Sequence, residues 1–379
     1  MSRVSIRDIY RYPYKLIAHK IVNMNPPAKP VRLTNKQFEE FKQELDAIID
    51  MYKKEFSEQK PTDWKTYEAQ WAQRLRTALK ELKSVIDEAE RRIRIRPKLF
   101  GRPPKAKAKQ KVLILSAKDL AQFSNRKMAN LLPLFSLFDD VDISYKTIER
   151  AYSDPMVRLI IHNMFVILVK RKGIKQADLT GDGTGYSLTI TKHYRSVREK
   201  AGEAAKSNEP NPPADAVAEP QTKQDKRRLF TYAFALMDLA SHMYVGYGAS
   251  LKSERAAFEA SLEIMCECGV EAKSVRLDQY YAGQSTAAVF GNDTSLYVIP
   301  KSNATIRGSY VWKDMVRDLI SYPFLFLKEY FRREHSESGF SADKRCDGWK
   351  IWQRRDERIE TATMFKGVWH NLLWLGANT

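Results

Sequence analysis

Three acidic residues in this sequence could do chemistry because of what surrounds them. Asp182 lies between Gly181 and Gly183 in a strand-like segment, where glycines let a ligand or backbone approach closely. Asp278 ends the short apolar segment VRLD, at the position where an open sheet places ligand-facing groups. Glu360 lies in an amphipathic helical pattern among basic residues. The three are far apart along the chain, so only folding could bring them together.

Carboxylates gathered in one site indicate cation-assisted chemistry. They repel one another unless protonated or bridged by cations, and oxygen-only ligands select hard ions such as Mg²⁺ or Mn²⁺. Two such ions about 4 Å apart activate water or a 3′-hydroxyl for displacement at a phosphodiester. Two rival assignments stay open: Asp178 precedes Asp182 on the same strand face, and Glu357 lies one helical turn before Glu360. Each carboxylate taken alone is equally compatible with a solvated surface position.

The composition indicates a polyanionic partner. The chain has 379 residues, with 64 Lys and Arg against 46 Asp and Glu, and a formal net charge of +18. Apolar residues make up 43%, which excludes wholesale disorder. The best apolar stretch, Met156–Val169, is interrupted by polar residues and is shorter than the ~20 residues of a membrane helix. The three cysteines form no zinc ligand set or disulfide framework. We expect a cytoplasmic protein with no membrane partner.

More than half of the net charge lies in one segment, Arg91–Lys111, which holds ten Lys and Arg and no acid. Its prolines favour an extended arm, and its GRPPK sequence resembles the short Gly-Arg-Pro cores that lie in minor grooves of DNA. A solvated linker is the alternative. The predicted DNA contacts in this arm are Arg102, Lys105, Lys107 and Lys109.

A helix-turn-helix pattern follows the arm, over residues 116–152. We expect Ser116 to cap a helix that begins at Lys118, with further helices after Ser124 and Ser144. The last of these helices turns its apolar residues toward a core. On its other side it presents Lys146, Thr147 and Arg150, which could read base edges in a major groove. Three-helix units that bind no DNA are also common.

The remaining periodicity predicts an α/β fold. Two N-terminal helices, Thr34 to Phe56 and Asp63 to about Ile95, either bury their stripes in a hairpin or form a homodimer. From residue 173, three consecutive strands precede alternating helices and strands, which predicts a mixed sheet with flanking helices. The predicted parts are a helical region (1–90), a basic arm (91–111), a helix-turn-helix DNA-binding domain (112–172) and a catalytic domain (173–379) with a disordered insertion at about 198–228 and a helical insertion at about 301–345.

Three segments, GDGTGYSLTITKHY, VRLDQYYAG and RRDERIETATMFKGVWHNLL, resemble the acidic motifs of DDE transposases of prokaryotic insertion sequences, of the insertion-sequence-four kind. The resemblance covers about residues 173–379. It implies an RNase H-like catalytic domain that binds terminal inverted repeats, cuts DNA with two Mg²⁺ or Mn²⁺ ions and joins the 3′-hydroxyl to target DNA. It implies that Asp182 bridges both metals, that Asp278 ligates one and Glu360 the other.

The third motif departs from the family pattern at one position. That motif carries a Tyr, an Arg and a Lys around the Glu; Arg355 and Lys366 could serve here as DNA-holding residues, but no Tyr precedes Glu360 in its helix. Tyr280 and Tyr281, just after Asp278, resemble an aromatic position that holds a flipped base, with core packing of one of them as the alternative.

Other DNA-joining chemistries lack their residues. No paired histidines suit a relaxase, no His-x-x-Arg suits a tyrosine recombinase, and GDGTG lacks the Lys of an ATP-binding loop. The strongest alternative is a non-catalytic DNA-binding protein, either an inactive transposase relative or a replication initiator. The basic segments suit both hypotheses, whereas the three acids favour the enzyme, acting on nucleoid DNA in a prokaryotic cytoplasm.

Overall fold

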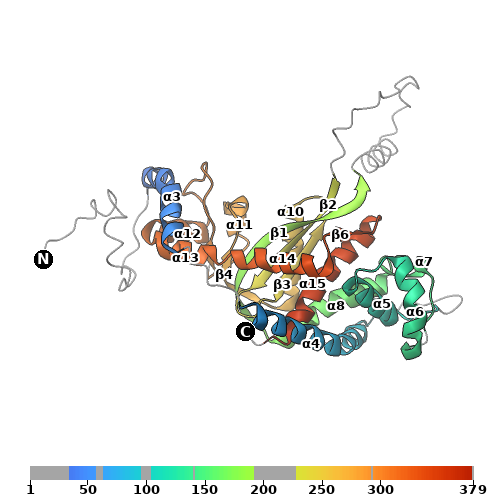
Figure 1. The fold of residues 1–379 in the computed structure, drawn as a ribbon. Helices are drawn as coiled ribbons and strands as arrows, with labels where there is room; N and C mark the ends of the chain where they lie inside the picture. The colour runs from blue at the N-terminus through green and yellow to red at the C-terminus, as the bar shows by residue number, and fades with distance from the viewer. Residues whose placement is uncertain are drawn as a thin grey trace, which may run out of the picture. The chain divides into compact units, whose positions relative to one another are not determined.

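The computed structural model of the chain describes residues 34–56, 63–94, 104–139, 141–191, 228–291 and 293–377 (Figure 1). The chain divides into two compact units, each built from two stretches of sequence. The first unit joins Met1–Pro61 to Arg276–Arg332, and the second joins Thr62–Val275 to Arg333–Thr379. The domain borders expected at residues 90, 111 and 172 stay predictions.

The second unit holds most of a six-stranded mixed sheet. β1 (Gln176–Thr191), β2 (Arg228–Asp238) and β3 (Tyr244–Ser250) form an antiparallel meander in which Asp182 lies opposite Ala235. β4 (Glu271–Arg276) pairs with β1, and the short β6 (Lys350–Ile351) runs parallel to β1. Flanking helices complete the unit, so the predicted α/β class with a mixed sheet is confirmed.

Helices cover both faces of β3. Gly248 faces α10 (Glu254–Cys268) so closely that an added Cβ would lie 1.9 Å from the Ala257 carbonyl oxygen. Tyr247 points to the opposite face, because successive strand residues alternate. There it meets α15 (Asp356–Leu375), where a Cβ on Gly367 would lie 2.6 Å from the Tyr247 ring. α4 (Trp64–Arg91) and α8 (Pro155–Lys172) pack beside α15 (Figure 1).

Three shorter helices, α5 (Ala108–Leu120), α6 (Asn125–Asp139) and α7 (Tyr145–Ala151), pack together in the predicted helix-turn-helix region (Figure 1). α7 has the predicted faces, with Ile148 buried and Lys146 exposed. The expected helix start at Lys118 is wrong. α5 already begins at Ala108, and the Ser116 hydroxyl donates to the Val112 carbonyl inside the helix (2.8 Å) instead of capping it. The end of the predicted extended arm is therefore helical.

The first unit is mainly helical. It contains α3 (Asn35–Phe56), the 3₁₀ turn η1 (Gln279–Tyr281), α11 (Gln284–Ala287), β5 (Ser295–Tyr297), α12 (Tyr310–Ser321) and α13 (Pro323–Phe331). The α3 stripe is used inside this unit, since the Tyr52 ring stacks on Phe331 at 5.3 Å and Lys42 donates to the Ser302 carbonyl at 2.7 Å. The predicted limits of α3 are confirmed.

Two helices end the second unit, α14 (Glu334–Asp347) and α15. The sequence predicts one helix from Trp349 onward, but α15 begins only at Asp356, because the preceding residues form β6 against β1 and a connecting loop. In the described part of the chain no single helix is long and apolar enough to span a membrane; α7 and α8 meet that requirement only as a pair bent by 56°.

Candidate active site

Asp182 lies in the middle of β1 with its side chain 20% exposed. The Gly183 N–H donates to its Oδ1 at 2.9 Å, and the Arg333 guanidinium lies 3.7 Å from its Oδ2. Gly183 points to the other face, where a Cβ would lie 2.3 Å from Cδ of Glu254. Gly183 therefore accommodates a side chain from α10, where the sequence led us to expect a ligand or backbone.

α14 brings three charged side chains to the Asp182 face of β1. Arg333 bridges two carboxylates, since its other terminal nitrogen lies 2.6 Å from Glu337 Oε1. About two helical turns after Glu337, Lys344 donates to the Thr184 hydroxyl at 2.6 Å. Burial lowers the pKa of Lys344, while the negative charge of Asp182 raises it. Asp182 and Thr184 share a strand face, so these groups form one mixed-charge cluster.

The approach of α14 is fixed by polar contacts at its start. The Thr180 hydroxyl on β1 donates to the Arg333 carbonyl (3.2 Å) and to the Ser336 hydroxyl (3.3 Å). Thr180 and Ser336 are both fully buried, and a buried hydroxyl is costly unless it is hydrogen-bonded. These bonds therefore set which side chains of α14 face Asp182.

The rival strand carboxylate, Asp178, lies on the same face of β1 but has a different partner. Its Oδ1 accepts a hydrogen bond from the Ser274 hydroxyl of the neighbouring strand β4. This contact ties β1 to β4, and it gives Asp178 a structural function that Asp182 does not share.

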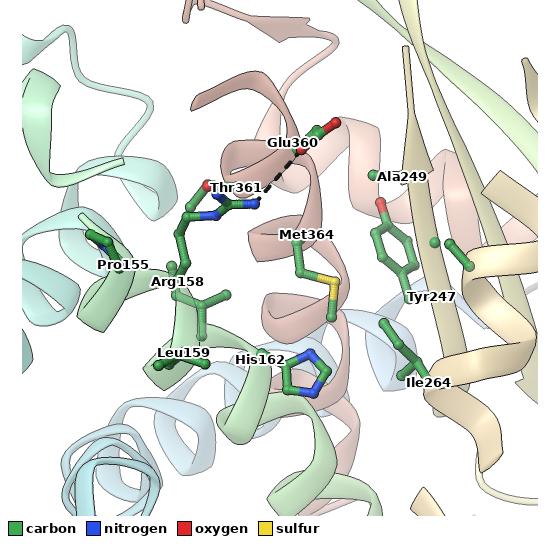
Figure 2. Close-up of a pocket in the computed structure, with 13 residues that line it drawn as sticks. Pro155, Arg158, Leu159, His162, Tyr247, Ala249, Ile264, Glu360, Thr361 and Met364 are labelled. Atoms are coloured by element: carbon green, nitrogen blue, oxygen red, sulfur yellow. Dashed lines mark ion pairs between the residues drawn. The ribbon is translucent and has the colours of Figure 1, made fainter. Parts of the chain in front are cut away.

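Glu360 lies on α15 in a largely apolar cavity of about 620 Å³ (Figure 2). Its carboxylate is 3.8 Å from the Arg158 guanidinium of α8, and Tyr247 and Met364 line the same cavity. Burial raises the pKa of Glu360, and Arg158 opposes this shift. Glu360 therefore pairs with Arg158, an arginine different from Arg333, which contacts both Asp182 and Glu337.

Asp278 belongs to the first unit. It follows β4 and caps η1, with its Oδ1 accepting from the Gln279 N–H at 2.8 Å. Of the two tyrosines that follow it, Tyr281 is buried, while Tyr280 is 58% exposed with the Lys301 ammonium 5.4 Å from its ring centroid. Core packing therefore accounts for Tyr281 and leaves Tyr280 as the accessible aromatic residue.

The metal ligands expected from the sequence do not form a ready set. Within the described ranges, no group of three or more His, Cys, Asp and Glu side chains is placed to hold a metal ion. Where Asp182 and Glu337 come together, the Arg333 guanidinium supplies the positive charge that keeps two carboxylates close.

The residues predicted to contact DNA have different surroundings. Arg102 lies outside the described residues, and Lys105 and Lys107 are exposed. Lys109 is partly buried, with its ammonium 3.0 Å from Asp87 and 3.9 Å from Glu90 on α4. In α7, Lys146 and Arg150 are exposed and the Thr147 hydroxyl bonds to Ser144.

The two basic residues predicted around Glu360 differ sharply. Arg355 is exposed at the N-cap of α15. Lys366 is buried, with 3% of its side chain exposed and its ammonium 3.4 Å from Asp119 on α5. The predicted DNA contact of Lys366 is therefore corrected to a structural ion pair between α15 and α5.

These features define a basic α/β protein whose β1 strand presents a carboxylate to an arginine, a glutamate and a lysine on α14. The chain is 38% identical over 342 residues, 90% of its own length and 96% of the relative's, to a probable transposase for insertion sequence element ISA1214 of Archaeoglobus fulgidus. It therefore belongs to the transposases of insertion sequence elements. No model of a known protein family and no solved structure matches it.

Arg333, Glu337 and Lys344 are not among the site residues predicted from the sequence. The sequence does carry a signal for them, because the third motif of the DDE transposases that it resembles has a Tyr, an Arg and a Lys around its Glu. Glu360 lacks the Tyr, whereas Glu337 follows Tyr330 and Arg333 and precedes Lys344. All four residues lie within the predicted helical insertion at about 301–345.

Proposed function

We propose that this transposase binds the terminal inverted repeats of its element, as a homodimer, cleaves DNA there and joins the freed 3′-hydroxyl to target DNA. Family membership, the net charge of +18 and the contacts of Asp182 and Glu337 with Arg333 support this proposal. The observation that carries it is the convergence of Glu337 and Asp182 on Arg333, because a protein that only binds DNA gains nothing from two carboxylates on an electropositive surface.

The proposed catalytic carboxylates are Asp182, Asp278 and a glutamate, in an RNase H-like domain of the DDE type. Geometry favours Glu337 as the glutamate, because it shares a guanidinium with Asp182. Glu360, the candidate from the sequence, stands in the cavity beside Arg158. Lys344, which donates to the Thr184 hydroxyl, would face a phosphate that approaches Asp182.

Mg²⁺ or Mn²⁺, two per site, is the proposed cofactor. The support is the chemistry of the donors alone, since carboxylate oxygens are the ligands that these ions prefer. Cleavage of DNA by the purified protein is expected to stop when metal is chelated and to return when Mg²⁺ or Mn²⁺ is added.

The test compares isosteric variants on a duplex that carries the element's own inverted repeat. Asp182→Asn, Asp278→Asn and Glu337→Gln are each expected to lower the cleavage rate by about 10³-fold or more, with DNA binding intact. Glu360→Gln is the matched control and should cleave within a few-fold of the parent.

If Glu360→Gln abolishes cleavage and Glu337→Gln does not, Glu360 is the third catalytic carboxylate. If the parent protein binds the repeat in the presence of metal yet never cleaves it, the chain is instead a non-catalytic DNA-binding relative of transposases.

A further inference from the structure

A second, smaller cavity lies where α6 and α7 meet the loop before α15. Its volume is about 300 Å³, the lower end of the range for small-molecule sites. Its lining includes Asn125 and Arg126 from the start of α6, Tyr145 from α7, and Trp352, Arg354 and Arg358 from the loop and α15. Asp182, Arg333 and Glu337 do not line this cavity, and all of its lining residues belong to the second unit.

The lining carries an excess of positive charge. Arg358 is 7% exposed and forms an ion pair with Glu149, so the charges of these two lining residues offset each other. Arg126 and Arg354 are both exposed, and the Arg126 guanidinium lies 5.2 Å from the Tyr145 ring centroid. The first turn of α6 contains no acidic residue, so the positive end of its helix dipole adds to the same field. The cavity is therefore suited to an anion.

Trp352 gives the cavity an aromatic face. Its side chain is 65% exposed, an unusual state for a large apolar ring, while Ile351 and Gln353 on either side of it are buried. The backbone is thus anchored on both sides of an outward-pointing indole. The Lys350 ammonium lies 5.8 Å from the ring centroid, which places another positive charge beside it.

An exposed indole next to arginines matches the chemistry of an unpaired nucleotide. A base has a π-face that stacks on aromatic rings, and its phosphate pairs with guanidinium groups. We propose that this cavity binds one nucleotide of single-stranded DNA, with the base stacked on Trp352 and the phosphate between Arg126 and Arg354. The proposal rests on the proposed function only in taking DNA as the ligand.

The test measures equilibrium binding of the full-length protein to a labelled oligodeoxythymidylate by fluorescence anisotropy. Trp352→Ala is expected to weaken binding about fivefold or more, as loss of one stacked base does. Trp349→Ala is the matched control: its side chain is 60% exposed and it lies beside β6, but it does not line the cavity. We expect this control to change affinity less than twofold.

Two further measurements distinguish the contribution of the base to binding from that of the phosphate. Replacing Arg126 and Arg354 together with Ala should lower the salt dependence of binding by about one phosphate contact, because both contact the same phosphate. Inorganic phosphate in large excess over the oligonucleotide, at constant ionic strength, should not displace it. Thermal unfolding of each variant identifies any that has lost its fold, and Trp352→Phe, which keeps a ring, should then restore binding.

Equal weakening by Trp352→Ala and Trp349→Ala, or none by either, would overturn the proposal. Full competition by inorganic phosphate would reduce the cavity to an anion site and would also overturn it. None of these measurements involves cleavage. A failure of the proposed catalytic carboxylates therefore leaves the nucleotide-binding result unaffected, and a failure of nucleotide binding at Trp352 leaves the cleavage result unaffected.

Discussion

Lys366 and Arg355 show how burial decides what a basic residue does. Both belong to the same basic stretch of sequence around Glu360, but Arg355 is exposed and Lys366 lies in the interior beside Asp119. A charged side chain is rarely buried unless it is paired, so Lys366 stabilises the packing of α15 on α5 and Arg355 stays available to DNA.

Replacing Lys366 should therefore affect stability before it affects DNA binding. Lys366→Met leaves the Asp119 carboxylate buried without this partner, and we expect the free energy of unfolding to fall by about 3 kcal/mol. Arg355→Met, the exposed control, should change it by less than about 0.5 kcal/mol. Chemical denaturation followed by circular dichroism measures both. Equal stability of the two variants would show that the Lys366–Asp119 pair contributes nothing.

The sequence was sufficient to place Asp182 in a strand and insufficient to identify the side chains that contact it. A carboxylate between two glycines in an alternating segment is a local pattern, and the structure places Asp182 on β1 beside Gly183 accordingly. Glu337 reaches it through a non-local event, the docking of α14 by the Thr180–Ser336 hydrogen bond. Local periodicity carries no information about which residue of a polar helix faces a distant strand.

At the level of elements, the caps predicted from the sequence had different outcomes. The Ser124 side chain accepts a hydrogen bond from the Lys127 N–H at 3.1 Å as predicted, whereas Ser144 lies at the N-cap of α7 without a side-chain capping bond. Ser116 has the same side chain but bonds back to Val112 within α5. A serine offers either bond, and the choice depends on whether the residues before it are already helical. Here Ala108 to Leu115 are already helical, although Ala108 to Lys111 belong to the predicted basic arm.

The contact of α10 with β3 depends on the absence of a side chain at Gly248. A Cβ there would lie 1.9 Å from the Ala257 carbonyl and 2.6 Å from the Ser261 nitrogen, both backbone atoms that cannot rotate away. Gly248→Ala should force α10 away from the sheet and lower the free energy of unfolding by about 2 kcal/mol or more.

Gly291→Ala is the matched control for this substitution, because no atom lies within 4 Å of its added Cβ. We expect a change below about 0.5 kcal/mol. Urea denaturation compares the two, and an unchanged midpoint for Gly248→Ala would mean that the helix shifts at no cost.

At the level of the whole molecule, the net charge of +18 can act in two ways. It can raise the affinity for any polyanion through the overall field, or it can act through individual phosphate contacts made by a few residues. The described part of the basic segment favours the second for Lys105 and Lys107, which are exposed. Lys109 is different, since Asp87 already neutralises its charge.

Salt dependence distinguishes these two possibilities. Replacing Lys105 and Lys107 together with Ala should reduce the slope of log affinity against log salt by about two, one for each lost phosphate contact. Lys109→Ala should reduce it by clearly less, because this lysine is already paired with acids of α4.

The charge-matched control replaces Lys80 and Lys83, exposed residues of α4 outside the segment. If both double variants lower the slope equally, the overall field governs DNA binding and the segment is a linker. A change confined to Lys105 and Lys107 makes the segment a DNA-contacting arm.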